Sequence, residues 1–214
     1  MTETGATREP LVNLIPYYLF VGLVIKPMFH LYFGGNIHGR ENVPQKGPLL
    51  IVCNHASYFD PPVLSYCVGR PVAYMAKEEL FNVPILKQLI RIYGAFPVSR
   101  ASADRSSIRN SIQALSQGWA TGIFLQGTRT SDGRITEPKL GAAMIAAKAK
   151  VPILPVCLWG TEKILAKSNF PDKVPLTVRI GKVIPTPQSS RKADLQKVVD
   201  ECAAVINEMH SLGR

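Results

Sequence analysis

The chain has 214 residues, of which 46% are hydrophobic and 19% are charged. This composition is typical of a single compact domain with a hydrophobic core, and it excludes an intrinsically disordered chain. The formal net charge of +10 indicates an anionic partner. Charge alone leaves open a phosphate-bearing substrate, an acidic carrier protein, an anionic lipid, nucleic acid, or simply a basic solvated surface.

The basic residues are scattered along the chain and form no known nucleic-acid-binding motif, so we expect no nucleic-acid partner. The four cysteines, at positions 53, 67, 157 and 202, match no spacing typical of a metal site or a redox pair. Three of them lie inside apolar runs, where a cysteine usually behaves as a small hydrophobic residue. Reduced thiols facing a cytoplasm are therefore expected.

The N-terminal segment, residues 1–35, has an uncharged apolar run from Pro10 to Ile25. The run is shorter than the ~20 residues that a membrane-spanning helix needs, and Pro16 is expected to break it. The acidic residues near the start and the lack of a cleavage site argue against a signal peptide. We expect a segment that lies in the membrane interface, with a helix packed on its own domain and a true membrane span as alternatives.

After this segment, short apolar runs alternate with stretches of helical spacing through residues 36–214, which we interpret as one domain. Such alternation predicts an α/β fold with a largely parallel mixed sheet flanked by helices. Pro97 indicates that its strand is an edge strand or is irregular. Strands are expected at residues 49–54, 72–76, 95–99, 122–126, 153–159 and 176–184, and helices at 61–68, 83–93, 103–117, 140–150 and 191–212.

The first candidate site is a histidine that follows a predicted buried strand. His55 comes directly after the strand, and Asp60 follows five residues later, next to Pro61. A turn between them can bring the two side chains together, since a residue before proline favours extended geometry. A histidine held by a carboxylate is a good general base. The alternatives are a loop histidine and an aspartate that caps the following helix.

No separate nucleophile accompanies this histidine. The chain has no G-x-S-x-G sequence, which argues against an α/β-hydrolase. Cys53 lies in the predicted strand, and Ser57 has the character of a turn residue. We therefore expect the base to activate a hydroxyl group of the substrate itself.

The second candidate site is a loop suited to an anion. Gly127 allows close approach of the backbone to a ligand, Thr128 offers a hydroxyl, and Arg129 offers a fork of donors that matches phosphate. Lys77 and Arg100 also follow predicted strands. Because ligands of α/β sheets bind at the carboxyl ends of strands, these three cations are expected to lie near His55. A Gly-Thr-Arg sequence is also common in turns.

These motifs resemble those of the glycerolipid acyltransferases, the family of 1-acyl-glycerol-3-phosphate acyltransferases. N-H-A-S-Y-F-D at residues 54–60 resembles the family's H-x-x-x-x-D signature, and F-L-Q-G-T-R-T at 124–130 resembles its F-P-E-G-T-R-S block. Further blocks follow in the family's order at residues 75–80, 96–100, 139–142 and 151–156. The resemblance covers residues 36–184.

The resemblance implies that a fatty acyl group passes from a thioester of coenzyme A or acyl carrier protein to the sn-2 hydroxyl of a lysophosphatidic acid. It implies His55 as base and Asp60 as its orienting partner. The acceptor's phosphate would lie against Arg129, Thr128, Gly127, Arg100 and Lys77. The scheme requires no metal and no cofactor besides the thioester co-substrate.

Gln126 stands where the family usually has Glu, and it keeps a hydrogen-bond acceptor without the charge. We include it among the candidate substrate-binding residues, with a shifted acceptor preference as one consequence. Glycerol-3-phosphate or another lysolipid as acceptor, and a non-catalytic lipid-binding membrane protein, stay open as alternatives. The expected location is the cytoplasmic face of a membrane.

Overall fold

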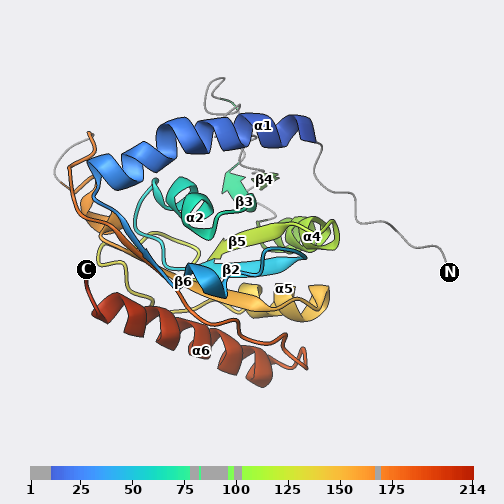
Figure 1. Ribbon diagram of the computed structural model, residues 1–214. Coiled ribbons are helices and arrows are strands. Elements are labelled where there is room, and N and C mark those ends of the chain that lie inside the picture. Colours follow the sequence, from blue (N-terminus) through green and yellow to red (C-terminus); the bar gives the residue numbers. More distant parts are fainter. Residues whose placement is uncertain (1–10, 78–81, 83–95, 99–102, 167–169) are drawn as a thin grey trace.

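The computed structural model describes residues 11–77, 82, 96–98, 103–166 and 170–214, and for 11–14, 75–77, 96–98 and 103–107 it describes the backbone alone. A seven-stranded sheet runs through the domain in the order β1-β7-β6-β2-β5-β3-β4 (Figure 1). Among the strand pairs that the structure describes, only β6 and β7 pair antiparallel, so the sheet is largely parallel, as predicted. The strands are β1 (Asn36–His38), β2 (Leu49–Cys53), β3 (Val72–Lys77), β4 (Phe96–Val98), β5 (Ala120–Phe124), β6 (Ile153–Trp159) and β7 (Thr177–Ile180).

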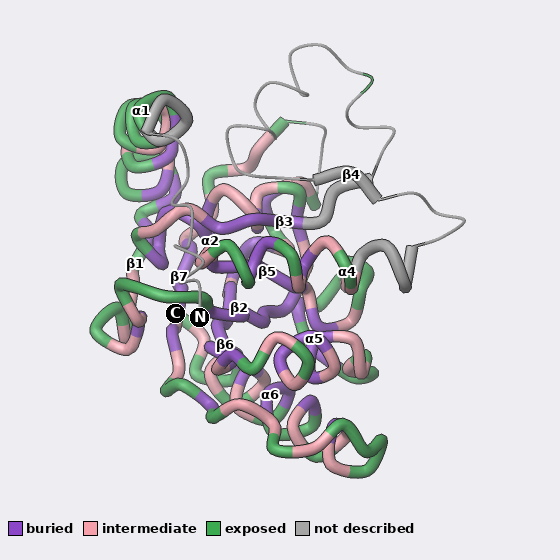
Figure 2. Tube along the Cα trace, turned by 90° about the vertical axis from the view of Figure 1, so that its right-hand side faces the viewer, coloured by how far each residue is buried: buried purple, intermediate pink, exposed green. Residues whose placement is uncertain are grey.

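Helices cover both faces of this sheet, which is why the central strand β2 is buried along its whole length (Figure 2). Leu49, Ile51 and Cys53 face a core that includes α2 and the N-terminal helix. Leu50 and Val52 face a second core on the other side. The helices are α2 (Asp60–Val68) on the first face and α4 (Ala103–Ser116), α5 (Gly141–Ala149) and α6 (Lys192–Ser211) on the second.

Most predicted elements are present, and their ends shift for local reasons. Strand β5 ends at Phe124, two residues before its predicted end. Leu125 is buried and still donates its N–H to the carbonyl of Cys53, and the chain turns away from the sheet after it. The seventh strand stops at Ile180, and only a bridge between Ile184 and Ile153 continues it. The prediction of an edge position for Pro97 is confirmed. The helix predicted at residues 83–93 lies outside the described residues. The short strand β1 was not predicted.

The N-terminal segment forms a helical stretch, and the expectation that Pro16 breaks the apolar run is wrong. The stretch passes from α1 (Leu11–Phe20) through two π-helical segments, η1 (Val21–Ile25) and η2 (Met28–Tyr32). The N–H groups of Lys26 and Phe33 bond five residues back, to Val21 and Met28. These wide turns let the stretch continue past Pro27, whose ring would clash with the carbonyl four residues earlier in an ordinary α-helix.

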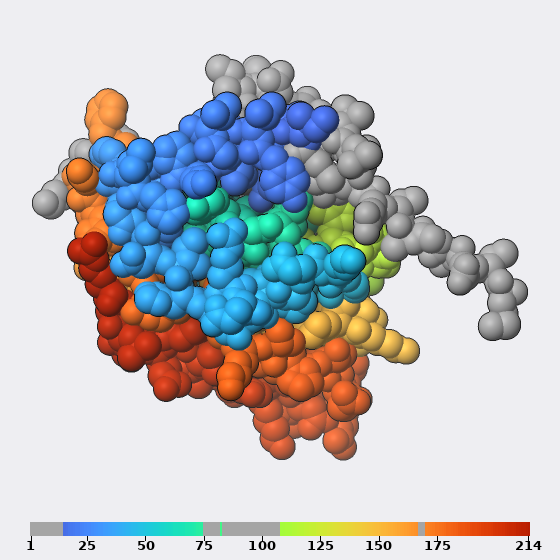
Figure 3. Space-filling view, viewed as in Figure 1, coloured from blue at the N-terminus to red at the C-terminus, as the bar shows by residue number. Residues whose placement is uncertain are grey.

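The N-terminal helix lies along the outside of the domain (Figure 3). One of its faces packs on the domain, and the other is apolar and exposed. Tyr17, Ile25, Phe29 and Phe33 are buried in the first core. The helical stretch Ile15–Tyr32 is long and apolar enough to cross a membrane by length and composition, and 17% of it is buried against the domain. The helix therefore combines packing on its own domain with an apolar outer face, which is formed by Ile15, Tyr18, Leu19, Leu23, Val24, Leu31 and Tyr32.

Candidate active site

The site begins where β2 ends, because Asn54 closes the strand with its side chain. Its amide nitrogen donates to the carbonyls of Leu158 and Gly133, and its amide oxygen accepts from the N–H of Leu158, each at 2.8 Å. The side chain is 1% exposed, so these polar groups would otherwise be buried without partners. The main chain of His55 is thereby released from the sheet and turns outwards.

His55 and Asp60 lie in direct contact, which confirms the predicted turn between them. Nδ1 of His55 is 2.7 Å from Oδ2 of Asp60, and the N–H groups of Ala56 and Ser57 donate to the same oxygen at 2.7 and 2.8 Å. Asp60 is fully buried and is the first residue of α2, where the helix dipole favours a negative charge. Its carboxylate organises the loop before the helix instead of capping the helix itself.

This contact determines which ring nitrogen of neutral His55 carries the proton. Because Asp60 accepts the bond, we assign the proton of neutral His55 to Nδ1. The lone pair then lies on Nε2, for which the described residues provide no hydrogen-bond donor. A ring in this tautomer can remove a proton at Nε2, and the carboxylate stabilises the imidazolium that results.

The ring of His55 is also held by stacking on an aromatic side chain. Its centroid lies 3.8 Å from that of Phe124, with an angle of 18° between the planes. Phe124 reaches this place because it pairs with Cys53 at the end of the β2–β5 ladder. Tyr74 from β3 stacks behind it at 6.3 Å. Two aromatic rings from neighbouring strands, Phe124 against the imidazole and Tyr74 behind Phe124, thus limit how far the imidazole can rotate.

The loop after β5 is attached to the histidine through the backbone. Thr130 donates to the carbonyl of His55 with its N–H at 2.8 Å and its hydroxyl at 3.3 Å. Gly127 has φ +72°, which a residue with a side chain rarely adopts, and the space around its Cα is open. The side-chain oxygen of Gln126 accepts from Thr136 N at 3.2 Å, so it closes the base of the loop.

Arg129 lies over the ring of Tyr58, which belongs to the turn between His55 and Asp60. Its guanidinium carbon is 3.7 Å from the ring centroid, and one of its nitrogens donates to the Tyr58 hydroxyl at 2.8 Å. A stacked guanidinium keeps donors at its edge for an anion. The predicted proximity of this cation to the histidine turn is confirmed.

A hollow of about 300 Å³ lies between the turn from His55 to Asp60, the loop after β5 that carries Arg129 (the arginine loop), and the segment after β6. Two buried atoms near it, Thr161 Oγ1 and Glu162 Oε2, have no hydrogen-bond partner within the described structure. The hollow joins polar and apolar surface, as a lipid headgroup with an attached chain requires. Its lining residues are Ala56, Ser57, Tyr58, Arg129, Thr161, Glu162 and Leu165.

Not all predicted site residues can be placed. Lys77 ends β3, which pairs with β5, but its side chain is not among those described. Arg100 lies outside the described residues. Thr128 is exposed in the arginine loop beside Gly127. Substrate binding by these residues and by Gln126 therefore stays a prediction.

Neither Cys53 nor Ser57 is arranged as a nucleophile. Burial raises the pKa of the Cys53 thiol well above its ordinary value, and the nearby Asp60 charge adds to this. Ser57 is buried and accepts from the N–H of Phe59, as expected of a turn residue. Within the described residues, no group of three or more His, Cys, Asp or Glu side chains lies close enough to hold a metal ion.

Several residues of the site were not found from the sequence. Phe124 could have been found only from the register of β2 against β5, and Tyr58 only from the path of the turn. Asn54 did carry a signal, because it is a polar residue directly after a buried strand. Thr161 and Glu162 follow β6 in the same way, at the carboxyl edge of the sheet where the predicted site lies.

The chain belongs to the acyltransferase family, whose sequence pattern matches residues 35–159. It is 34% identical over 146 residues to the 1-acyl-sn-glycerol-3-phosphate acyltransferase of Bacillus subtilis. This match covers 67% of this chain and 71% of that protein. It is 31% identical over 150 residues to the chloroplastic 1-acyl-sn-glycerol-3-phosphate acyltransferase LPAT1 of Arabidopsis thaliana, but the match spans only 41% of that longer protein.

The fold also matches a solved member of the family. The crystal structure of PlsC, the 1-acyl-sn-glycerophosphate (LPA) acyltransferase from Thermotoga maritima, superimposes with a TM-score of 0.69 at 27% identity, covering 92% of this chain and 87% of that one. The α/β class and the acyltransferase assignment predicted from the sequence are therefore confirmed.

Proposed function

We propose that this enzyme transfers a fatty acyl group from acyl-CoA or acyl carrier protein to the sn-2 hydroxyl of 1-acyl-glycerol-3-phosphate, giving phosphatidic acid for phospholipid biosynthesis. The observation that carries the proposal is the 2.7 Å contact of His55 with Asp60 at a turn that Arg129 covers. Relatives named for this reaction support the choice of acceptor. We place the reaction at the cytoplasmic face of a membrane.

His55 performs the proton transfers. Its Nε2 removes the proton from the sn-2 hydroxyl as that oxygen attacks the thioester carbonyl. The tetrahedral intermediate then collapses, the carbon–sulfur bond breaks, and the imidazolium returns the proton to the departing thiolate. Asp60 keeps the proton on Nδ1 and stabilises the transient positive charge. General-base catalysis of this kind typically contributes ~10²–10⁴-fold in rate.

Arg129 holds the acceptor by its phosphate. Its stacking on Tyr58 holds the cation against the turn between His55 and Asp60. Gly127 and Thr128 would add a backbone amide and a hydroxyl, and Lys77 and Arg100 further positive charge. The acyl chains of donor and acceptor both partition into a membrane, where the apolar face of the N-terminal helix would place the enzyme.

The test is transfer of a labelled acyl chain by the purified full chain. Acyl-CoA and acyl carrier protein serve as donors, with lysophosphatidic acid, glycerol-3-phosphate and lysophosphatidylethanolamine as acceptors. Phosphatidic acid should be the main product, and His55→Ala should reduce its formation by at least a hundredfold. His38→Ala is the matched control, because His38 is exposed on β1, away from the site.

Near-normal turnover by His55→Ala would refute the assignment of the base. Preference for one of the other acceptors would refute the proposed substrate but not the acyl transfer. Binding of lipid without any transfer, from either donor, would favour a non-catalytic lipid-binding protein.

A further inference from the structure

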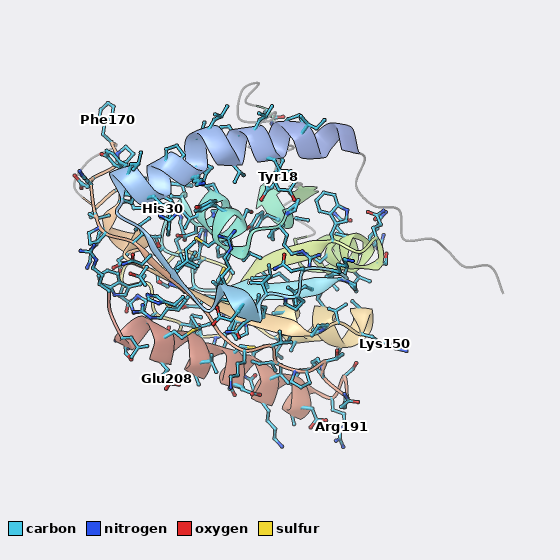
Figure 4. All side chains as sticks on the ribbon, viewed as in Figure 1. Tyr18, His30, Lys150, Phe170, Arg191 and Glu208 are labelled. Carbon is cyan, nitrogen blue, oxygen red and sulfur yellow. The ribbon has the colours of Figure 1, made fainter. Side chains whose placement is uncertain are left out.

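A second exposed apolar point lies near the N-terminal helix but far from it in sequence. Phe170 is 80% exposed, which is more than Leu31 at 78% or Leu23 at 74% on the outer face of the helix. Figure 4 shows it projecting outwards beyond the end of that helix, whereas Glu208 and Arg191 point away from α6 on the opposite side of the molecule. Single exposed hydrophobic residues are common, so the position of this residue has to be argued from its surroundings.

The segment between β6 and β7, which carries Phe170, is held to the domain by a backbone hydrogen bond. The N–H of Asp172 donates to the carbonyl of Ile164 at 2.7 Å, and Ile164 is fully buried in the first core. Asp172, two residues after Phe170, is therefore held against the core.

The same segment is attached to the N-terminal helix. The hydroxyl of Tyr32, on η2, donates to the carbonyl of Pro171 at 2.7 Å. The contact joins the exposed end of the helix to the residue next to Phe170, and Figure 3 shows the two segments side by side at one edge of the molecule. The outer face of the helix and Phe170 can thus meet a single flat surface.

The segment also forms part of the candidate active site. Thr161, Glu162 and Leu165, at its start, line the hollow that Arg129 and Tyr58 close from the other side. Phe170 therefore belongs to the same connection between β6 and β7 that forms one wall of the hollow. His55 itself does not line the hollow, but its neighbour Ala56 does, so a lysolipid in the hollow would lie beside the turn that carries the base.

The charges of these elements fit an anionic lipid surface. The sequence from Leu11 to Arg40 contains no Asp or Glu. Lys26 on the helix, and Lys163 and Lys173 on either side of Phe170, are exposed. Lys163 is paired with Glu162, and Asp172 lies next to Lys173, so the net positive charge comes mainly from the helix. Basic residues that surround inserted apolar residues are typical of proteins that lie on anionic membranes.

We infer that Phe170 is a second membrane-insertion point, which together with the outer face of the N-terminal helix sets the mouth of the active-site hollow against an anionic bilayer. The inference rests on the proposed membrane function but concerns a different element. It defines which edge of the sheet faces the lipid. The competing explanation is that a second copy of the chain covers the same face.

The first experiment measures insertion directly. F170W and a control, V183W, are mixed with vesicles of phosphatidylglycerol and phosphatidylcholine that carry brominated acyl chains. Val183 is exposed beyond β7, at the opposite end of the sheet. The signal that the added tryptophan contributes over the wild type should shift to the blue and be quenched in F170W and stay unchanged in V183W.

If the chain sediments with the vesicles while the F170W signal is unquenched, the inference is wrong. It is also wrong if quenching is absent and gel filtration shows that Phe170→Asp converts a dimer to a monomer, since a second copy then covers this face. Neither readout depends on catalysis, so failure of the proposed reaction would leave this result interpretable.

The second experiment separates insertion from folding and chemistry. Phe170→Asp should weaken sedimentation with anionic vesicles by roughly tenfold, the effect of losing one inserted aromatic side chain. It should slow transfer to vesicle-borne lysophosphatidic acid but leave unchanged the transfer to a short-chain, monomeric acceptor. Equal loss with both acceptors would show that Phe170 serves the fold or the chemistry, and the inference would then fail.

Discussion

The side-chain amide of Asn54 bonds both the N–H and the carbonyl of Leu158, so that one side chain takes the place of a peptide group where the β2–β6 ladder ends. The same amide also holds Gly133, in the loop that carries Arg129. One buried residue thus connects the strand that positions the base to the loop that positions the cation.

Asn54→Ala should therefore reduce stability and turnover together. Three hydrogen bonds are lost and the backbone groups left behind are buried, which costs about 3 kcal/mol at ~1 kcal/mol each. For a chain of this size the melting temperature should fall by roughly 6–12 °C. Thermal melts and steady-state kinetics check this, with Asn36→Ala, exposed on β1, as the control. An unchanged melting temperature would contradict the connecting role.

Phe124→Leu should lower kcat without changing the KM of the acceptor. The ring that stacks on His55 is lost, and an aromatic contact of this kind contributes ~0.5–1.5 kcal/mol. If that energy orients the base, kcat should fall roughly two- to thirteenfold. Phe124→Tyr keeps the ring and should retain most of the activity. Equal kcat values for the Leu and Tyr variants would show that stacking does not orient His55.

Arg129→Ala should raise the KM of the phosphate-bearing acceptor by roughly ten- to a hundredfold, the value of one or two charge-assisted hydrogen bonds. Tyr58→Phe keeps the stacked ring and removes only the hydroxyl, so its effect should stay within about threefold. Arg134→Ala, an exposed arginine in the same loop, is the control. A rise in KM for Arg134→Ala alone would transfer the phosphate role to that residue.

His210 should make stability depend on pH. It is 8% exposed near the end of α6, and burial lowers its pKa from the ordinary value of 6.5, against a smaller opposing effect of Glu162. The unfolded chain therefore binds a proton more readily than the folded one. Stability is complete above pH ~6.5 and falls as the pH drops below it, by at most about 1.4 kcal/mol per pH unit.

Thermal melts between pH 7.5 and 5.5 measure this effect. The melting temperature of His210→Gln should depend less on pH than that of the wild type, whereas His38→Gln should match the wild type. If all three chains lose stability in parallel, other groups cause the acid sensitivity.

Gly160 should tolerate no side chain, because a Cβ there would lie 2.4 Å from the carbonyl oxygen of Pro175. Gly47 also has a positive φ but has open space around it. Gly47→Ala should cost only the backbone strain, about 1–2 kcal/mol. Gly160→Ala adds a clash with the backbone and should be the more destabilised variant in urea. Equal losses would mean that the segment around Pro175 moves aside.

Apart from the short β1, which was missed, and the helix at residues 83–93, which stays a prediction, the sequence was sufficient to predict the strand-and-helix order. It also predicted the pairing of His55 with Asp60, because the order and the pairing both depend on local signals. Apolar runs mark buried strands, and a proline after Asp60 limits the turn. The stacking of Phe124 on His55 depends on the register between β2 and β5, which is a long-range property that no local pattern encodes.

The N-terminal segment shows a different limit. Pro16 was expected to break the apolar run, but it lies inside α1, and wide turns around residues 21–33 carry the helix on past Pro27. Such turns have no sequence signature, because they depend on the packing of Phe29 and Phe33 in the core. The two-sided character of this helix could also not be predicted, since both of its faces are apolar.

All four cysteines are buried, and burial raises the pKa of the Cys157 and Cys202 thiols to about 12. The folded protein therefore presents no reactive sulfur of its own to a maleimide or to an aromatic disulfide dye. Every thiol that such a dye counts during turnover must come from the spent donor, so the rate can be followed continuously by eye or spectrophotometer. For the same reason, a single cysteine introduced on the surface can be labelled without first removing the native ones.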